Sequence, residues 1–204
     1  MTEETKSSSD PAAVPLGRKG PLERFLDELE APAPSPCGGT AAAVAAAMAA
    51  ALVTMVARGS EAWVDGAGVA SQARALRSRL TTLGDDDAAA FEQVLVTMRD
   101  RSGTPEQRDF VLGEALLRAA EVPLEIAEAA ADAAELAALA ATEGAPQLRP
   151  DATAAAILAE AAVRAATHLV EINLATVAGD QHSRRAETLS AAAADARARA
   201  LGSV

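Results

Sequence analysis

The sequence predicts an all-α protein, an up-and-down multi-helix bundle of long antiparallel helices. Half of the residues are apolar and alanine supplies much of that half, and alanine is the best helix former because it loses no side-chain entropy. Aromatic residues make up only 2% of the chain, so the side chains that strands favour are scarce. Apolar residues also recur at steps of three and four, which is the spacing of one helix face.

The first part of the chain is divided by composition. Residues 1–20 carry Ser, Pro and Gly without periodicity, so we expect a disordered N-terminal tail. A helical domain is expected over residues 21–204. It begins with a short helix whose apolar residues share one stripe: Leu22, Phe25, Leu26 and Leu29. Prolines and glycines over residues 31–39 then break the helix.

An alanine-rich helix is expected from Thr40 to just before Gly59, and its residues 40–57 carry no charge. Its length suits a membrane span, but a span needs about 20 predominantly apolar residues and this segment is mostly alanine. The favoured interpretation is a buried central helix whose small side chains let neighbouring helices approach closely.

A long helix is expected over residues 69–100. Its apolar seam contains one carboxylate, Asp87, and reads Val69, Ala73, Leu76, Leu80, Leu83, Asp87, Ala90, Val94 and Met98. These steps of four and three are typical of a heptad-like helix face that packs against a partner.

The next helix is expected to start after Thr104 and to run to about Thr142. A hydroxyl at the cap, proline at the first position and glutamine three residues after the cap favour this start. Pro123 lies inside the helix, where it should cause a kink and leave the carbonyl of Ala119 without its normal partner.

Two further helices complete the expected bundle. Asp151 should cap the first, which ends near Gly179; Asp180 should open the second, which ends at Gly202. Long antiparallel helices with short loops give an up-and-down bundle. The long apolar seams also indicate helix pairing between subunits, so we expect a homodimer.

Composition excludes several classes of function. The net charge of −11 disfavours nucleic acid and membrane surfaces as partners. The only lysines are Lys6 and Lys19, so the helical domain has no Schiff-base or P-loop lysine. Cys37 is the only cysteine and the first residues resemble no signal peptide, so a cytoplasmic location is expected. One thiol and two scattered histidines make no recognisable metal site.

Two features are candidates for a site. The segment Gly38, Gly39 and Thr40 leads into a helix, so its free amides could bind an anionic ligand; a tight turn with a threonine cap is the alternative. Asp87 lies on an apolar seam, where lost solvation raises the pKa of a carboxyl group and suits it to acid–base work. A buried ion pair or a residue that fixes helix register is the alternative.

Asp151 and Asn173 are weaker candidates. Asp151 could face a ligand or act only as a helix cap, and Asn173 could bind a ligand or be a satisfied buried amide. They lie about 33 Å apart along a straight helix, so they cannot serve one site within one subunit, but an antiparallel partner could bring them together. His168 is interpreted as part of a solvated charge stripe and Cys37 as a small apolar residue.

Several segments in order resemble one known family. Residues 25–29 and 34–40 are similar to its F-L-x-x-L and P-x-P-G-G-G-S motifs, and residues 87–94 to its D-x-x-A-F-x-x-V motif. Residues 122–124, Asp151 and residues 172–174 are similar to its V-P-L, S-D and I-N-L segments. The chain therefore resembles the formiminotetrahydrofolate cyclodeaminase and methenyltetrahydrofolate cyclohydrolase family over about residues 21–200.

The resemblance implies an all-helical homodimer that uses a tetrahydrofolate derivative as substrate, without metal or nucleotide. We expect cyclohydrolase or cyclodeaminase activity, with Asp87 exchanging protons, Asp151 orienting substrate or water, and Gly38, Gly39, Thr40 and Asn173 binding the ligand. The chain departs from the family pattern at Cys37, Thr40, Pro150, Leu169 and Glu171. A catalytically silent helical dimer that binds a folate-like ligand or a protein partner is therefore the alternative.

Overall fold

The computed structural model describes residues 20–32, 36–174 and 181–202. The chain divides into two compact units, residues 1–33 and residues 34–204. In the first unit, α1 spans Pro21–Glu30 and begins with the proline at its first turn. The expected disordered tail over residues 1–20 lies outside the described residues except for Gly20.

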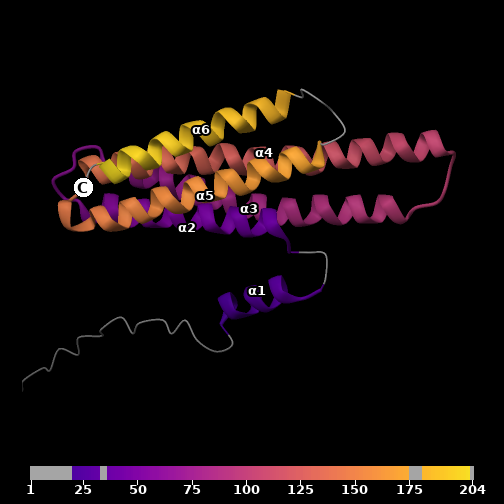
Figure 1. Cartoon of the computed structure of the whole chain (residues 1–204). Coiled ribbons are helices and arrows are strands. Elements are labelled where there is room, and N and C mark those ends of the chain that lie inside the picture. The colour runs from indigo at the N-terminus through magenta and orange to yellow at the C-terminus, as the bar shows by residue number, and fades with distance from the viewer. Residues whose placement is uncertain (1–19, 33–35, 175–180, 203–204) are drawn as a thin grey trace, which may run out of the picture. The chain divides into compact units, whose positions relative to one another are not determined.

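The second unit is a bundle of long helices. They are α2 (Gly38–Gly59), α3 (Gly66–Arg99), α4 (Pro105–Glu143), α5 (Arg149–Asn173) and α6 (Gln181–Gly202), with a 3-10 turn, η1 (Pro146–Leu148), before α5. Consecutive helices pack side by side and run antiparallel (Figure 1). No strand occurs within the described ranges. The predicted all-α, up-and-down bundle is confirmed, and the homodimer stays a prediction.

The core of the bundle is built mainly from alanine. Each of α2 to α6 buries several alanines, and α2 packs against α3, α4 and α5. The large fully buried side chains are aliphatic: Leu80, Ile126, Val53, Val56, Val122, Val163, Val170 and Pro123. Because the distance between packed helices depends on the side chains at the contact, alanine allows the backbones to approach closely. The expected central position of α2 is confirmed, but only 11 of its 22 residues are buried, so the expected burial holds for one face of the helix.

Two stretches are long and apolar enough to cross a membrane, judged by length and composition alone. They are α2 and Pro146–Asn173, and 56% and 44% of their most apolar windows are buried inside the protein. A core helix has the same length and composition, so this property agrees with the central positions of α2 and α5.

The boundaries of α5 correct two expectations. Asp151 is not the cap: Leu148 precedes the helix, which begins at Arg149, so Asp151 lies within the first turn. The reason is that η1 runs directly into α5, and the helix starts before the carboxylate is reached. The helix also ends at Asn173 instead of near Gly179. Residues 175–180, with the expected opening residue Asp180, lie outside the described ranges.

Helices α3 and α4 form a hairpin that projects beyond the ends of the other helices (Figure 1). The predicted seam of α3 is buried from Val69 to Val94 apart from the half-buried Leu76, but Met98 is 56% exposed. Within residues 91–118, Val94 alone is buried. The capping box predicted at Thr104 is present and stabilises the return into α4. The outer part of the hairpin therefore packs mainly on itself.

Pro123 interrupts the hydrogen bonds of α4 without ending the helix. The carbonyl of Ala119, which loses its normal donor, accepts a hydrogen bond from Nδ2 of Asn173 at 2.6 Å. Ala119 is buried, so water cannot supply this bond in its place. The side chain of the last residue of α5 thus replaces the missing backbone donor and fixes the end of α5 against α4.

This contact predicts that Asn173→Ala lowers the free energy of unfolding by about 1–3 kcal/mol, because a buried carbonyl loses its donor. Pro123→Ala restores a backbone N–H at position 123, so the same substitution should cost less in that background. Urea denaturation of the wild type, both single variants and the double variant measures the difference. An equal cost in both backgrounds would show that this hydrogen bond is not the origin of the loss.

Candidate active site

The start of α2 packs against the middle of α3 and brings predicted site residues together. Oγ1 of Thr40 donates to the carbonyl of Gly84 at 3.1 Å and also lies 3.4 Å from Oδ2 of Asp87. The thiol of Cys37 donates to the same Oδ2 at 3.3 Å. The carboxylate on the seam and the glycine-rich helix start, which are about 50 residues apart in the sequence, therefore form one cluster.

Gly39 makes this cluster possible because it has no side chain. A Cβ atom added at Gly39 would overlap the carboxylate of Asp87, whereas one added at Gly38 would meet nothing within 4 Å. The carboxylate therefore lies directly against the first turn of α2, whose amides have no partner inside the helix. The amide of Thr40 is among the donors to Asp87.

The environment of Asp87 makes its carboxyl group a weaker acid than an ordinary aspartate. The residue is only 6% exposed, and this burial raises the pKa of the carboxyl group. Hydrogen bonds from the thiol of Cys37 and from the amide and hydroxyl of Thr40 act in the opposite direction but leave the pKa raised. A carboxylate with a raised pKa is a stronger proton acceptor, which is the property that acid–base catalysis needs.

Cys37 is a hydrogen-bond donor in this cluster, so its interpretation as a small apolar residue missed its contact with Asp87. Burial and the neighbouring negative charge of Asp87 raise the pKa of the thiol, and the amides of Gly39 and Thr40 only partly oppose this. The thiol is therefore kept as S–H, which makes it a donor and a poor nucleophile. Its position just before the two glycines, as the residue preceding α2, was the available signal.

A cavity of about 220 Å³ opens beside the carboxylate. Four helices and the residue before α2 contribute its lining, which consists of Cys37, Gly38, Asp87, Phe91, Ala119, Pro123, Leu169, Ile172 and Asn173. Gly38, Asp87 and Asn173 thus line one cavity, with Gly39 and Thr40 behind the carboxylate. The apolar lining residues could not be recognised as site residues from the sequence, because Phe91 and its neighbours follow the same periodicity as core residues.

Asp151 does not join this cavity within one chain. It lies in the first turn of α5, whereas Leu169, Ile172 and Asn173 lie at the end of that helix. The separation along α5 is about 33 Å at 1.5 Å per residue. A contribution of Asp151 to the site of a second subunit stays a prediction.

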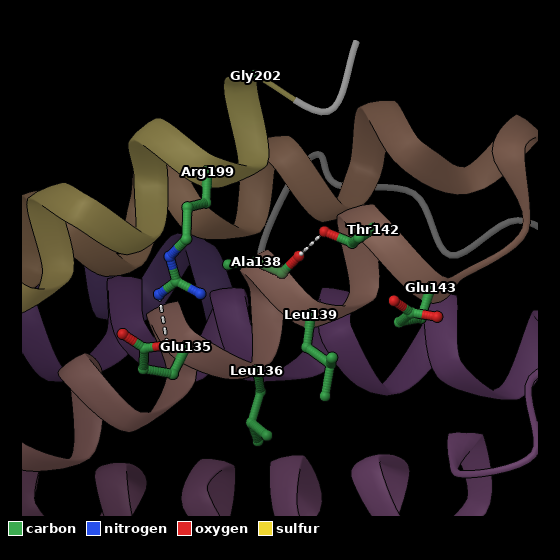
Figure 2. Close-up of a pocket in the computed structure, with 8 residues that line it drawn as sticks. All are labelled: Glu135, Leu136, Ala138, Leu139, Thr142, Glu143, Arg199 and Gly202. Carbon is green, nitrogen blue, oxygen red and sulfur yellow. Dashed lines mark hydrogen bonds and ion pairs between the residues drawn. The ribbon is translucent and has the colours of Figure 1, made fainter.

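A larger surface groove lies elsewhere, between α4 and α6 (Figure 2). Its volume is about 680 Å³, and its lining residues are Glu135, Leu136, Ala138, Leu139, Thr142, Glu143, Arg199 and Gly202. Its exposed Glu135 forms an ion pair with Arg199 at 2.6 Å. No buried ionisable side chain lies in this lining. The groove is larger than the cavity at Asp87, but it lacks a group suited to proton transfer.

Metal ligands and histidines add no second centre. Within the described residues, no cluster of three or more His, Cys, Asp and Glu side chains could hold a metal ion. His168 is exposed and lies 3.7 Å from Glu171, one turn further along α5. The interpretation of His168 as part of a solvated charge stripe is confirmed.

Comparison with known proteins agrees with this arrangement. The formiminotransferase-cyclodeaminase family profile matches residues 21–194. The chain belongs to this family. A methenyltetrahydrofolate cyclohydrolase from Methylorubrum extorquens is 35% identical over 162 residues, which are 74% of this chain and 78% of that protein. The family resemblance inferred from the motifs is confirmed.

A solved structure shares the fold of this family member. The crystal structure of formiminotetrahydrofolate cyclodeaminase from Thermotoga maritima matches with a TM-score of 0.79 and 26% sequence identity. The match covers 89% of this chain and 94% of that chain. The helical arrangement that forms the Asp87 cavity therefore belongs to a fold that extends over nearly all of both proteins.

The contact at Gly39 predicts a sharp difference between neighbouring glycines. Gly39→Ala should displace the Asp87 carboxylate or the start of α2, and so destabilise the protein and disrupt the cavity. Gly38→Ala should be tolerated, because its Cβ meets no atom. Thermal unfolding of the two variants provides the comparison. Equal melting temperatures would contradict the close contact.

The raised pKa of Asp87 predicts how stability depends on pH. An aspartate in the unfolded chain titrates near its ordinary pKa of about 3.9. Between that value and the raised native pKa the folded protein binds more protons, so the free energy of unfolding must fall as pH rises through this window. Asp87→Asn cannot ionise, so it should lack this fall and be more stable than the wild type above the window.

Urea denaturation of both proteins at a series of pH values, from about 4 upward, measures this difference. Asp85→Asn changes an exposed carboxylate two residues away and serves as the control, with no comparable effect expected. A difference between wild type and Asp87→Asn that does not vary with pH would contradict the raised pKa.

Proposed function

We propose that the protein is a folate-dependent one-carbon enzyme that acts as a methenyltetrahydrofolate cyclohydrolase. The observation that carries this proposal is the buried carboxylate of Asp87, which faces a cavity and has no basic side chain among the residues lining it. Family membership and the relative named as a cyclohydrolase give the class of substrate. In this proposal Asp87 is the catalytic residue.

The proposed reaction opens the methenyl bridge with water. Water adds to the bridging carbon, which shares the positive charge of the methenyl group, and Asp87 accepts the proton that the water loses. The bond from this carbon to one ring nitrogen then breaks. That nitrogen takes the proton from Asp87, and the added hydroxyl releases its own proton to solvent and becomes the formyl oxygen. A carboxylate in a poorly solvated cavity also stabilises the cationic substrate.

The helix start positions the catalytic group in this proposal. The Cys37 thiol and the Thr40 hydroxyl both lie within hydrogen-bonding distance of one oxygen of the Asp87 carboxylate, which restricts its orientation. Gly39 provides room for the carboxylate, while Gly38 and Asn173 contact the ligand from the cavity wall. No proposed step requires a metal or a nucleotide.

Cyclodeaminase activity is the second candidate, and the similar fold of the Thermotoga maritima cyclodeaminase favours it. That reaction expels an amine from a tetrahedral carbon, so the same carboxylate would return a proton to the leaving nitrogen. A silent folate-binding relative is the third candidate, since Cys37 stands where the family has glycine. Both differ from the main proposal in products that an assay can separate.

The size of the cavity bears on the assembly. Sites that enclose drug-sized ligands measure about 300–1,000 Å³, so a cavity of about 220 Å³ holds the reacting end of a folate and leaves the rest outside. We propose that a homodimer completes the site. The acidic charge and single cysteine support a small-molecule enzyme of the cytoplasm, without nucleic acid or membrane partners.

The decisive experiment adds purified protein to methenyltetrahydrofolate and follows the loss of its near-ultraviolet absorbance, with the spontaneous rate subtracted. Asp87→Asn should lower kcat by about 100- to 10,000-fold, the usual contribution of a general base, while Asp85→Asn should not. The wild-type rate should fall as pH drops through the raised pKa of Asp87, because protonation removes the acceptor.

Other outcomes select between the candidates. Release of ammonia from formiminotetrahydrofolate without hydrolysis of the methenyl compound would favour the cyclodeaminase. Folate binding without either reaction would favour the silent relative. Full activity of a folded Asp87→Asn variant would show that another group accepts the proton.

A further inference from the structure

One face of α2 carries an apolar stripe that its own bundle does not bury. We call it the outer stripe of α2; its members are Ala41, Val44, Met48, Ala51, Met55 and Arg58, at alternating steps of three and four. None of them is buried, and Met48 and Met55 are 49% and 40% exposed. Arg58, at the C-terminal end, is the only charged residue of the stripe. An apolar helix face of this length indicates a surface that another protein chain covers.

The outer stripe is complementary to a second copy of itself. A two-fold axis that crosses α2 between residues 49 and 50 places Ala41 opposite the partner's Arg58, Val44 opposite the partner's Met55, and Met48 opposite the partner's Ala51. Each pair joins a smaller side chain to a larger one, so the two antiparallel stripes can interdigitate. Such self-complementarity is the requirement of a symmetric dimer interface.

The charges at the two ends of α2 fit the same pairing. The start of α2 packs against Gly84, and the exposed Asp85 and Asp86 follow directly on α3. The last turn of α2 carries Arg58, which forms no ion pair with any residue that the structure describes. In an antiparallel pair the basic last turn of each α2 lies near the acidic residues beside the start of the partner helix. This arrangement favours antiparallel over parallel pairing.

The candidate site lacks the cation that such a pairing would supply. No basic side chain lines the cavity. A folate carries carboxylates at the end that must lie outside the cavity. The Arg58 of the same chain is about 30 Å from Gly38 along α2, so it cannot reach them.

We propose that two copies pair through the outer stripe of α2, and that the partner's Arg58 binds the anionic end of the folate at the mouth of the Asp87 cavity. The partner's Arg58 falls beside Ala41, one helical turn from Gly38 in the cavity lining. Each active site is therefore composite, with the proton acceptor from one subunit and the anion-binding arginine from the other. This inference rests on the proposed folate function.

The interface is tested without any use of activity. Light scattering should give twice the chain mass of 20.6 kDa, and Met48→Glu should give the monomer mass. In a Cys37→Ser background, Met48→Cys with Ala51→Cys should form disulfide-linked dimers on mild oxidation. Ala192→Cys with Asp195→Cys, an exposed pair of the same spacing on α6, should not. The pairing would be overturned by a monomeric wild type, by recovery of the protein in membranes, or by disulfide-linked dimers that form only in the α6 control.

The shared site is tested by mixing impaired subunits, assayed with folate below the wild-type KM so that the effect of Arg58→Ala on KM appears in the rate. Asp87→Asn and Arg58→Ala should each be impaired alone, but in a symmetric dimer mixed at random about a quarter of the wild-type sites should be intact, because each mixed dimer holds one complete site. If Arg58 served its own subunit, both sites of a mixed dimer would be damaged and no activity would return. That result would overturn the proposal and leave the folate function intact.

The role of Arg58 is tested by its effect on KM. Arg58→Ala should raise KM for the folate about tenfold with a smaller change in kcat, as expected for one lost charge-assisted hydrogen bond. Arg58→Lys should recover part of the loss, and Arg184→Ala, an exposed arginine on α6, should change neither constant. If the wild type proves inactive, the folate function fails, and the mass and cross-linking measurements still decide the interface.

Discussion

Close packing of alanine-lined helices is the constraint on which the rest of the structure depends. Along α2 alanine is the commonest buried residue, and Ala42, Ala43, Ala46 and Ala49 are each almost completely buried. With only a methyl group between neighbouring backbones, there are few flexible side chains that could shift to accommodate a change. Hydroxyl groups enter this core only with partners, as when Thr54 donates to the carbonyl of Ala50.

The candidate site is formed where one position of α2 lacks even the methyl group of an alanine. At most positions along α2 a methyl group fills the space next to the neighbouring helix, but at Gly39 a carboxylate occupies that space. The cost of burying Asp87 is offset only in part by its hydrogen bonds, since the pKa of the group stays raised. A group that costs stability yet sits beside a cavity is the pattern expected where function and stability oppose each other.

The helical fold could be predicted from the sequence because local signals and the global structure agree. The seam of α3 and the capping box at Thr104 depend on residues within one or two turns, and both are present. The start of α5 was mispredicted because a 3-10 turn leads directly into the helix, and no side chain in the sequence marks such a turn. A capping carboxylate and a carboxylate in the first turn look alike in a sequence.

The site could be predicted only in its polar members. Asp87 stands out because a charge on an apolar seam is unusual, and two adjacent glycines mark a close approach. The thiol contact of Cys37 and the bond from Asn173 to Ala119 join segments about 50 residues apart, so they depend on how helices are placed in space. Phe91 has the same spacing as a core residue. It lines a cavity only because α2 begins at Gly38 and α5 ends at Asn173, beside it.

The projecting hairpin of α3 and α4 has a consequence for local motion. Its outer turns bury few side chains, so opening them exposes little apolar surface and should require much less free energy than unfolding the whole bundle. Amide hydrogens along α3 should then exchange with solvent slowly as far as Asp87 and quickly beyond Phe91. The cavity lies at this boundary. Phe91 is the lining residue that belongs to the outer hairpin, so opening of these turns would expose the cavity on the side of Phe91 without disturbing the alanine core.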